Sequence, residues 1–234
     1  MRGDVSVART EQQTLQLIAQ VSPKSAITEM YRGLRTNLDF ASVDAKVKRI
    51  LVTSSLPGEG KTTTACNLAV VEAQAGRRTL LLDADLRKPM VHRNFSASNA
   101  KGLTSVLIRQ CSVEDAIQKT AVENLEILCS GPIPPNPLEM LGSQAMRSLL
   151  DQFAATYDVL IVDSPPVLSV ADAKVLASEL DGVLYVVGSG IVSRSALRKA
   201  KESLAVSGVR VLGAVFNNKR MTKAERQYYY YQYE

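Results

Sequence analysis

The sequence is poor in residues that form disulfides or bind transition metals. It has one histidine, His92, and its three cysteines are Cys66, Cys111 and Cys129. The cysteines have neither the even number of a disulfide framework nor the spacing of a metal motif, so we expect reduced, partly buried thiols. His92 follows a polar stretch without an obvious partner, which favours a structural over a catalytic role.

Long hydrophobic runs are also absent. No apolar run approaches the ~18 residues needed to cross a bilayer. No signal-peptide core follows the polar residues 1–4. The hydrophobic fraction of 46% and the charged fraction of 22% are ordinary for a globular protein. The sequence therefore predicts one domain with a substantial core that folds and stays in the cytosol.

The net charge of +5 is dispersed along the chain. Neither a basic stripe interleaved with aromatic residues nor a helix-turn-helix pattern is present, so we expect no nucleic-acid partner. Affinity for anionic phosphate or for an anionic membrane surface explains the positive excess equally well.

Short apolar segments alternate with helix-length segments along the chain. The predicted strands, rich in Val, Leu and Ile as in a sheet covered on both faces, are residues 49–54, 78–83, 125–128, 157–163, 183–188 and 209–216. The predicted helices are residues 61–75, 113–119, 144–156, 171–179 and 193–207. This alternation indicates right-handed βαβ units, and hence the α/β class with a doubly wound, mainly parallel sheet.

Residues 54–63 follow the first predicted strand and have the pattern of a phosphate-binding loop. Gly58 and Gly60 remove side chains where backbone N–H groups must approach phosphate oxygens. Lys61 adds charge for the outer phosphates, and the Thr62 hydroxyl can ligate Mg²⁺. The residues predicted to contact the nucleotide here are Pro57, Gly58, Glu59, Gly60, Lys61, Thr62 and Thr63.

The loop departs from G-x-x-x-x-G-K-[ST] at its first glycine, where Ser55 stands. We expect a serine with ordinary backbone dihedral angles to fit there. The alternative is a plain glycine-containing strand-to-helix turn, which the Gly-Lys-Thr triplet after an apolar strand disfavours.

Carboxylates follow two other predicted strands. Asp83 and Asp85 come after a run of leucines, and Asp163 ends the strand at residues 157–163. Ligands of doubly wound sheets gather beyond the carboxyl ends of the strands, so we expect these groups to meet the phosphate loop. Mg²⁺ is bound by few protein oxygens, which suits this set. The alternative for each aspartate is a helix cap or turn residue.

Together these motifs resemble the bacterial tyrosine kinases of capsule and exopolysaccharide synthesis. That family is a branch of the deviant-Walker P-loop ATPases, which also include Min-type and Par-type proteins. The resemblance runs from about residue 27 to the C-terminus. Min-type and Par-type proteins carry a signature lysine five residues before the Walker lysine, whereas this sequence has Leu56 there.

The chain ends in a tyrosine cluster. Five of the eight tyrosines lie in the last seven residues, namely Tyr228, Tyr229, Tyr230, Tyr231 and Tyr233. Chain ends are weakly ordered, so these side chains can reach the active site of a neighbouring copy. The resemblance implies that they are the autophosphorylated residues. A low-complexity tail or a docking segment is the alternative.

A second motif, E-x-x-R-x-x-R, consists of Glu29, Arg32 and Arg35. At helical spacing, one predicted apolar face is Ile27, Met30, Tyr31, Leu34 and Leu38. Glu29 can pair with Arg32, and Arg35 with Asp39, but exposed pairs contribute only a few tenths of a kcal/mol. A solvated helix face is therefore one interpretation. The resemblance implies the other, a subunit contact in a ring.

The predicted organisation has an N-terminal arm (residues 1–26), a P-loop kinase domain (27–217) and a flexible tyrosine-rich tail (218–234). The main apolar residues of the arm are Leu15, Leu17 and Ile18. We expect the arm to dock on a neighbouring copy or on a membrane partner.

The resemblance also assigns roles. Asp83 is the proposed proton acceptor for the incoming phenol, Lys61 neutralises charge on the β- and γ-phosphates, and Thr62, Asp85 and Asp163 hold Mg²⁺. Spacing does not decide which aspartate is the base and which is a ligand.

Three further residues also receive assignments. Asn217 is carried over as an adenine contact. Arg87 and Lys88 either bind the negative charge of a substrate, contact a ring neighbour, or belong to an ordinary exposed loop.

The function predicted from the sequence is an ATP- and Mg²⁺-dependent tyrosine autokinase. It phosphorylates its own tail between subunits and regulates polysaccharide polymerisation and export. The implied partners are further copies in a ring, a transmembrane activator that recruits the chain from the cytoplasm to the inner membrane face, and a tyrosine phosphatase. The alternative is a Min/Par-like switch ATPase whose tail is a docking peptide.

Overall fold

The computed structural model describes residues 17–41, 47–206 and 208–219. The tyrosine cluster at residues 228–233 and residues 1–16 of the predicted arm lie outside this part of the chain.

The described residues form one sheet whose strands lie in the order β3-β4-β2-β5-β1-β6-β7. The strands are β1 Arg49–Ser54, β2 Thr79–Asp83, β3 Ile117–Lys119, β4 Leu125–Leu128, β5 Val159–Asp163, β6 Gly182–Gly188 and β7 Val211–Asn217. All neighbouring strands pair in parallel except β3 and β4. The predicted α/β class with a mainly parallel sheet is confirmed.

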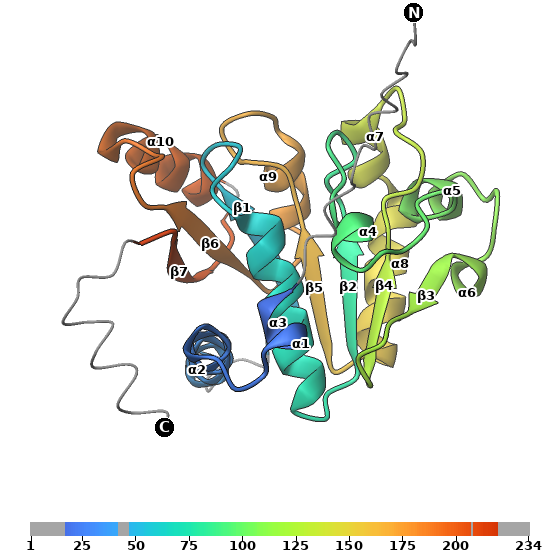
Figure 1. The fold of residues 1–234 in the computed structure, drawn as a ribbon. Helices are drawn as coiled ribbons and strands as arrows, with labels where there is room; N and C mark the ends of the chain where they lie inside the picture. The colour runs from blue at the N-terminus through green and yellow to red at the C-terminus, as the bar shows by residue number, and fades with distance from the viewer. Residues whose placement is uncertain (1–16, 42–46, 207, 220–234) are drawn as a thin grey trace, which may run out of the picture.

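Helices cover both faces of the sheet (Figure 1). They are α1 Ile18–Val21, α2 Ala26–Ala41, α3 Lys61–Gln74, α4 Val91–Asn94, α5 Leu103–Leu107, α6 Val113–Ala116, α7 Pro137–Leu141, α8 Gln144–Thr156, α9 Asp172–Ala177 and α10 Arg194–Ala205. One hydrophobic core lies between the sheet and α8, α9 and α10, and the other between the sheet and α3. This double covering explains why the strands are apolar on both faces.

One predicted helix, residues 113–119, is wrong in its second half. It ends at Ala116, and Ile117–Lys119 form β3, which pairs antiparallel with β4. Without β3, the outer backbone groups of β4 would lack partners, so hydrogen bonding at the sheet edge outweighs helix extension. The short helices α4, α5 and α7 were not predicted either, because four or five residues carry too little periodicity.

Helix α2 packs against α3, but less of its predicted apolar face is buried than expected. Leu38 is buried, whereas Ile27 is 52% exposed. The predicted pairing of Arg35 with Asp39 is wrong. Asp39 accepts two hydrogen bonds from Arg77, at 2.7 Å each, and Arg35 donates to a backbone carbonyl of α3. The predicted pair of Glu29 and Arg32 is present.

Helix α1 belongs to the predicted arm and packs on α3 of its own chain. Leu17 and Ala19 are buried, and the Ala19 N–H donates to Asn67 Oδ1 of α3 at 2.9 Å. The described end of the arm is thus part of the folded unit.

The three cysteines are free, as predicted, and two of them are buried. Within the described ranges, no helix combines the length and the apolar character that a membrane-crossing segment needs.

Candidate active site

The phosphate-binding motif forms the turn between β1 and α3, at the top of Figure 1. Gly58 and Gly60 have φ angles of 85° and 90°, which favour glycine. A Cβ atom on Gly60 would also lie 1.9 Å from Nδ2 of Asn217, at the end of β7. The backbone conformation therefore favours glycine at position 60, and any side chain there would displace the Asn217 amide.

Ser55 fits at the first glycine position of the motif because its φ is negative. Its hydroxyl forms a hydrogen bond with the Tyr185 hydroxyl of β6. No left-handed conformation is needed there, and the side chain is satisfied in the core.

Two side chains brace the loop from within. The Glu59 carboxylate, which is buried, accepts hydrogen bonds from the N–H groups of Leu56 and Gly188, at 2.6 and 2.8 Å. Asn217 Nδ2 donates to the Glu59 carbonyl at 3.0 Å. Asn217, expected to contact adenine, thus supports the loop in this structure, and the Glu59 side chain faces the protein.

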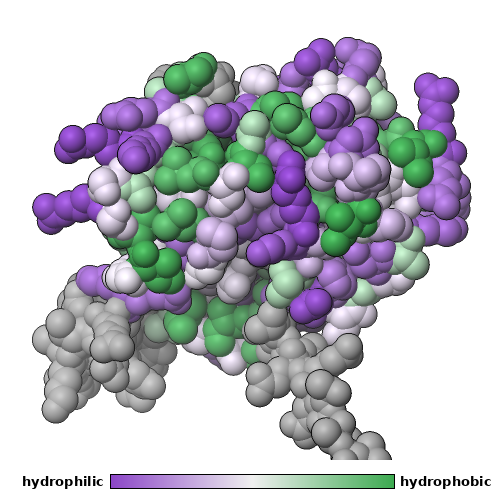
Figure 2. All heavy atoms as spheres, turned by 90° about the horizontal axis from the view of Figure 1, so that it is seen from above, coloured by the Kyte–Doolittle hydropathy of each residue, from purple (hydrophilic) through white to green (hydrophobic). Residues whose placement is uncertain are grey.

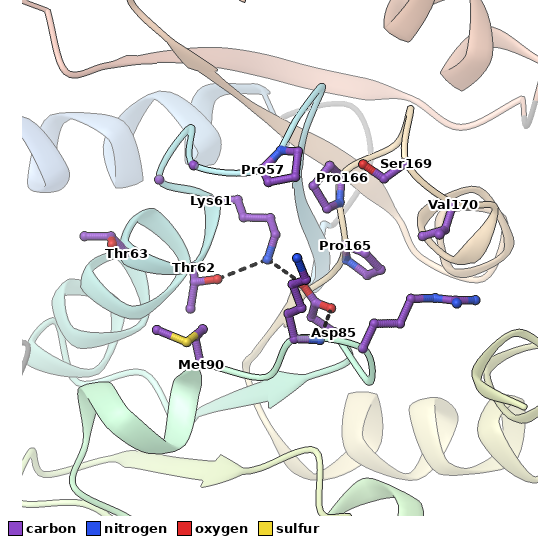
Figure 3. A pocket seen from close by; sticks show the side chains of 14 residues that line it. Pro57, Lys61, Thr62, Thr63, Asp85, Met90, Pro165, Pro166, Ser169 and Val170 are labelled. Atoms are coloured by element: carbon purple, nitrogen blue, oxygen red, sulfur yellow. Dashed lines mark hydrogen bonds and ion pairs between the residues drawn. The ribbon is translucent and has the colours of Figure 1, made fainter. Parts of the chain in front are cut away.

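Charged side chains from three strand ends meet beside the loop. Lys61 Nζ lies 2.9 Å from Asp85 Oδ2 and 3.6 Å from Asp163 Oδ1 (Figure 3 shows the first contact). The Thr62 hydroxyl donates to Asp163 Oδ2 at 2.6 Å. Asp83 and Asp163 are register neighbours on β2 and β5. The residues expected to meet at this sheet edge do so.

Burial of these groups shifts their proton affinities. Burial raises the pKa of Asp83 to about 8, and the neighbouring Asp163 adds to the shift. Burial also raises the pKa of Asp163, although Lys61 opposes this. For Lys61, burial lowers the pKa, but Asp163 and Asp85 outweigh it, so the net shift is upward. Lys61 is therefore charged at neutral pH.

Asp83 is occupied by backbone donors. Its carboxylate accepts the N–H groups of Asp85, Met90 and Val91, at 3.2, 3.1 and 3.0 Å. It is fully buried and is not among the described residues that line the cavity beside the phosphate loop, whereas Asp85 is. Asp83 thus shapes the chain that follows β2.

The oxygens of Thr62, Asp85 and Asp163 fit the requirements of Mg²⁺. Asp163 Oδ1 is buried and has no hydrogen-bond donor among the described residues, because its contact with Lys61 Nζ at 3.6 Å is too long for a hydrogen bond. A buried acceptor without a donor is costly unless a ligand satisfies it. The Thr62 hydroxyl lies against the other oxygen of the same carboxylate. One hydroxyl and one or two carboxylates are the usual protein share of a Mg²⁺ site, the rest being water and phosphate.

The cavity has a volume of about 560 Å³ and three walls. One wall is the phosphate loop with the start of α3. The others are residues 84–90 after β2, here the β2 loop, and residues 164–171 after β5, here the β5 loop. Its apolar lining is Pro57, Met90, Pro165, Pro166 and Val170. Figure 3 shows these side chains around Lys61, and Figure 2 looks onto this edge, where hydrophobic patches lie between hydrophilic ones. Apolar walls beside a charged floor suit an aromatic ring that carries a reactive oxygen.

Arg87 and Lys88 lie in the β2 loop and line the same cavity. The Arg87 guanidinium binds the carboxylate of Asp172, the first residue of α9, through two hydrogen bonds of 2.8 and 3.0 Å. The Lys88 side chain is exposed, and its backbone N–H donates to Asp85 Oδ1 at 3.0 Å.

The sequence analysis missed part of this lining. Pro165 and Pro166 directly follow the strand that ends at Asp163, so their position could have indicated them. Met90 and Val170, which also line the cavity, and Asp172, the partner of Arg87, carry no local signal.

Comparisons with known proteins agree with this geometry. A family profile described as an AAA domain matches residues 47–199. The chain is 49% identical over 214 residues to "Tyrosine-protein kinase YwqD" of Bacillus subtilis, covering 92% of this chain and 90% of that protein. It is 38% identical to "Putative tyrosine-protein kinase CapB" of Staphylococcus aureus, covering 89% and 92%. The solved structure of the chimerical protein CapA2B2 superposes with a TM-score of 0.85 at 42% identity, covering 88% and 90%.

Proposed function

The chain belongs to the bacterial tyrosine-protein kinases, and on this premise we propose that it phosphorylates the tyrosines of its own C-terminal segment. The acceptors are Tyr228–Tyr231 and Tyr233, which enter the cavity of a neighbouring copy. The observation that carries the proposal is the cavity itself, in which apolar walls stand beside Lys61 and Asp85, while the buried Asp163 contacts Lys61.

ATP binds with its phosphates in the phosphate loop. The backbone N–H groups around Gly58 and Gly60 and the Lys61 ammonium face the β- and γ-phosphates. Thr62, Asp85 and Asp163 would hold Mg²⁺, directly or through water, and Asn217 would lie near the adenine. When bound, the ion neutralises charge on the phosphoryl oxygens.

The transfer forms a bond between the phenol oxygen and the γ-phosphorus. The bond from that phosphorus to the bridging oxygen breaks, and ADP leaves. Because the pKa of a phenol is ~10, the reaction benefits from a nearby carboxylate that accepts the proton. Lys61 offsets the charge that develops on the leaving ADP.

Two aspartates are candidates for that carboxylate. Asp83 is the one that the family resemblance favours, although its oxygens are held by backbone donors in this conformation. Asp85 lines the cavity, but Lys61 holds it at 2.9 Å. Catalytic hydrogen bonds often form only in the substrate complex, so we keep Asp83 as the proposed base and Asp85 as the alternative.

Phosphorylation between copies requires an assembly, and we assign its contact to Glu29, Arg32 and Arg35 of α2. Replacing these three residues with alanine should reduce the mass measured by light scattering to that of a monomer. The double variant Arg147→Ala, Glu179→Ala, which removes a surface ion pair between α8 and a residue just beyond α9, is the matched control. An unchanged mass in the α2 variant would remove the motif from the interface.

The proposed biological role rests on the resemblance to the family. Relatives are named as the tyrosine-protein kinases CapB, EpsB and CpsD, and we propose, on the resemblance to the kinases of capsule and exopolysaccharide synthesis, that this chain regulates polysaccharide polymerisation and export. A transmembrane activator would recruit the chain to the inner face of the membrane, and a tyrosine phosphatase would reset the tail.

A switch ATPase that recruits partners through its tail is the alternative function. Leu56, in place of the signature lysine of Min-type and Par-type proteins, favours the kinase. Incubation with ATP and Mg²⁺ followed by intact mass measurement distinguishes the two. The kinase gains successive phosphate masses that disappear when the five tail tyrosines are replaced with phenylalanine. Release of ADP without mass gain would establish the switch ATPase.

A further inference from the structure

The β2 and β5 loops form two facing walls of the cavity, and their separation is fixed at two places. Among the described residues, two hydrogen-bonded contacts link the β2 loop to Asp163 and Asp172, the two residues that flank the β5 loop. At the base, the Ala84 N–H donates to the Asp163 carbonyl at 2.8 Å. At the rim, Arg87 binds Asp172 through Nε and Nη2. The base is set by the sheet, so the rim contact is the adjustable one.

The rim contact has the geometry of a specific ion pair. Both oxygens of Asp172 accept hydrogen bonds from one guanidinium, an arrangement that fixes direction as well as distance. The Asp172 side chain is only 1% exposed, whereas the Arg87 side chain is 41% exposed. A buried carboxylate is expensive without its partner, so the pair anchors the β2 loop to the start of α9.

The pair lies beside the apolar part of the cavity. Met90 follows Arg87 in the β2 loop, and Val170 precedes Asp172 at the end of the β5 loop. Figure 3 shows Met90 and Val170 on opposite sides of the cavity. The phosphate loop, in contrast, is braced by Glu59 and Asn217, and neither of these contacts the ion pair.

We propose that the Arg87–Asp172 ion pair positions the acceptor tyrosine by holding the two apolar walls at the separation that a phenol ring requires. The inference rests on the proposed kinase function and adds a pair of positioning residues to it. Arg87 and Asp172 take no part in the chemistry. They act through the walls that they join, and correct placement of the phenol for in-line attack is what they supply.

The test measures the KM for the acceptor peptide and the affinity for the nucleotide separately. The enzyme is the full chain with its five tail tyrosines replaced by phenylalanine, and the acceptor is a synthetic peptide of residues 224–234. Arg87→Gln, Asp172→Asn and the double variant should each raise the KM for the peptide by about tenfold. The affinity for a fluorescent ATP analogue should stay within about twofold, because the phosphate loop has its own braces.

Two comparisons distinguish positioning from general damage. The double variant should resemble each single variant, since either change removes the same contact, and Arg87→Lys should recover part of the peptide affinity. Arg147→Gln breaks a pair of 2.9 Å between α8 and the residue Glu179, just beyond α9, and should leave the KM unchanged. The fraction of ATP hydrolysed without tyrosine phosphorylation should rise in the Arg87 and Asp172 variants only.

Several outcomes would overturn the inference. They are an unchanged peptide KM in Arg87→Gln and Asp172→Asn, additive effects in the double variant, or a parallel loss of nucleotide affinity. Melting temperatures identify a variant that fails to fold. In that case the peptide KM of Arg87→Lys decides, because lysine keeps the charge but loses the pair of hydrogen bonds to Asp172. If the parent enzyme hydrolyses ATP but never phosphorylates the peptide, the kinase proposal itself fails, and the inference fails with it.

Discussion

A group of charged side chains lies at each end of helix α3. The two groups differ in whether all of their carboxylate oxygens have hydrogen-bond donors. At the N-terminal end, Lys61 lies between Asp85 and Asp163, and one Asp163 oxygen is buried without a donor. At the C-terminal end, Arg77 donates to Glu72 at 3.0 Å and to both oxygens of Asp39.

The N-terminal group is therefore a candidate ligand site, whereas the C-terminal group is a structural contact between two helices. Unsatisfied buried acceptors cost stability, so they are retained where a ligand supplies the missing contact. The pairs at the other end are complete, and they tie α2 to α3. At one end of α3 a buried carboxylate oxygen is thus left for a ligand, and at the other end the charges hold α2 against α3. Four predictions probe this contrast.

The largest effect is expected at the N-terminal end. Lys61→Met should reduce tail phosphorylation by at least about a thousandfold, because the charge that neutralises the outer phosphates is lost. The melting temperature should stay close to that of the parent. Phosphotyrosine immunoblotting and thermal melting are the measurements, and the control is Lys48→Met, which directly precedes β1 at the end opposite to the phosphate loop. A normally folded Lys61→Met protein that still phosphorylates its tail would remove Lys61 from catalysis.

The next prediction distinguishes the roles of Asp163 and Asp83, two carboxylates near the N-terminal end of α3. Asp163→Asn should raise the Mg²⁺ concentration needed for activity, because Asp163 supplies the buried oxygen without a donor. Asp83→Asn should bind ATP and Mg²⁺ normally and transfer about a hundredfold more slowly, if Asp83 accepts the proton. Kinase rates across a Mg²⁺ titration test both. Identical titrations and identical residual rates would show that the division of roles is wrong.

At the C-terminal end the expected effect is on stability. Burial raises the pKa of Glu72 from 4.5 to about 7, although Arg77 opposes the shift. Folded Glu72 therefore holds its proton where the unfolded chain has lost it, and stability falls as pH rises through this window. From pH 4.5 to 7, the free energy of unfolding of the parent should fall by about 2–3 kcal/mol relative to Glu72→Gln.

Urea unfolding of both proteins at a series of pH values checks this. Asp83 also has a raised pKa, but it is present in both proteins, so its contribution cancels in the difference. If the free energy of unfolding of the parent relative to Glu72→Gln does not change with pH, or rises with it, the assignment of a protonated Glu72 is wrong.

The smallest effect concerns Asp39. Its side chain is 44% exposed, and Arg77 keeps Glu72 as a partner when Asp39 is lost. Asp39→Asn should change the free energy of unfolding by less than about 0.5 kcal/mol, as is usual for exposed pairs. A loss above about 1.5 kcal/mol in urea unfolding would mean that Asp39, Arg77 and Glu72 act as one network.

Sequence reasoning succeeded where the signal is local. The phosphate loop is one continuous motif, and Asp83 and Asp163 stand directly after strands whose apolar runs are plain in the sequence. Since parallel strands end at the same sheet edge, predicting the strands was enough to predict that these groups meet.

It failed where distant segments decide. Asp39 was assigned to Arg35 on the same helix, but Arg77, from the turn after α3, reaches it instead. The pair of Arg87 with Asp172 joins residues 85 positions apart. Residues 117–119 became a strand because β4 offered an edge. Such contacts depend on tertiary packing, which one-dimensional periodicity does not contain.

The contact between Gly60 and Asn217 has a practical consequence for recombinant fragments. Asn217 follows the phosphate loop by more than 150 residues, yet its amide holds the Glu59 carbonyl and closes over Gly60. A gene fragment that stops before codon 217 would encode the whole phosphate-binding motif and still produce a poor nucleotide binder. Domain boundaries for expression should therefore be drawn beyond β7, whatever the motif alone indicates.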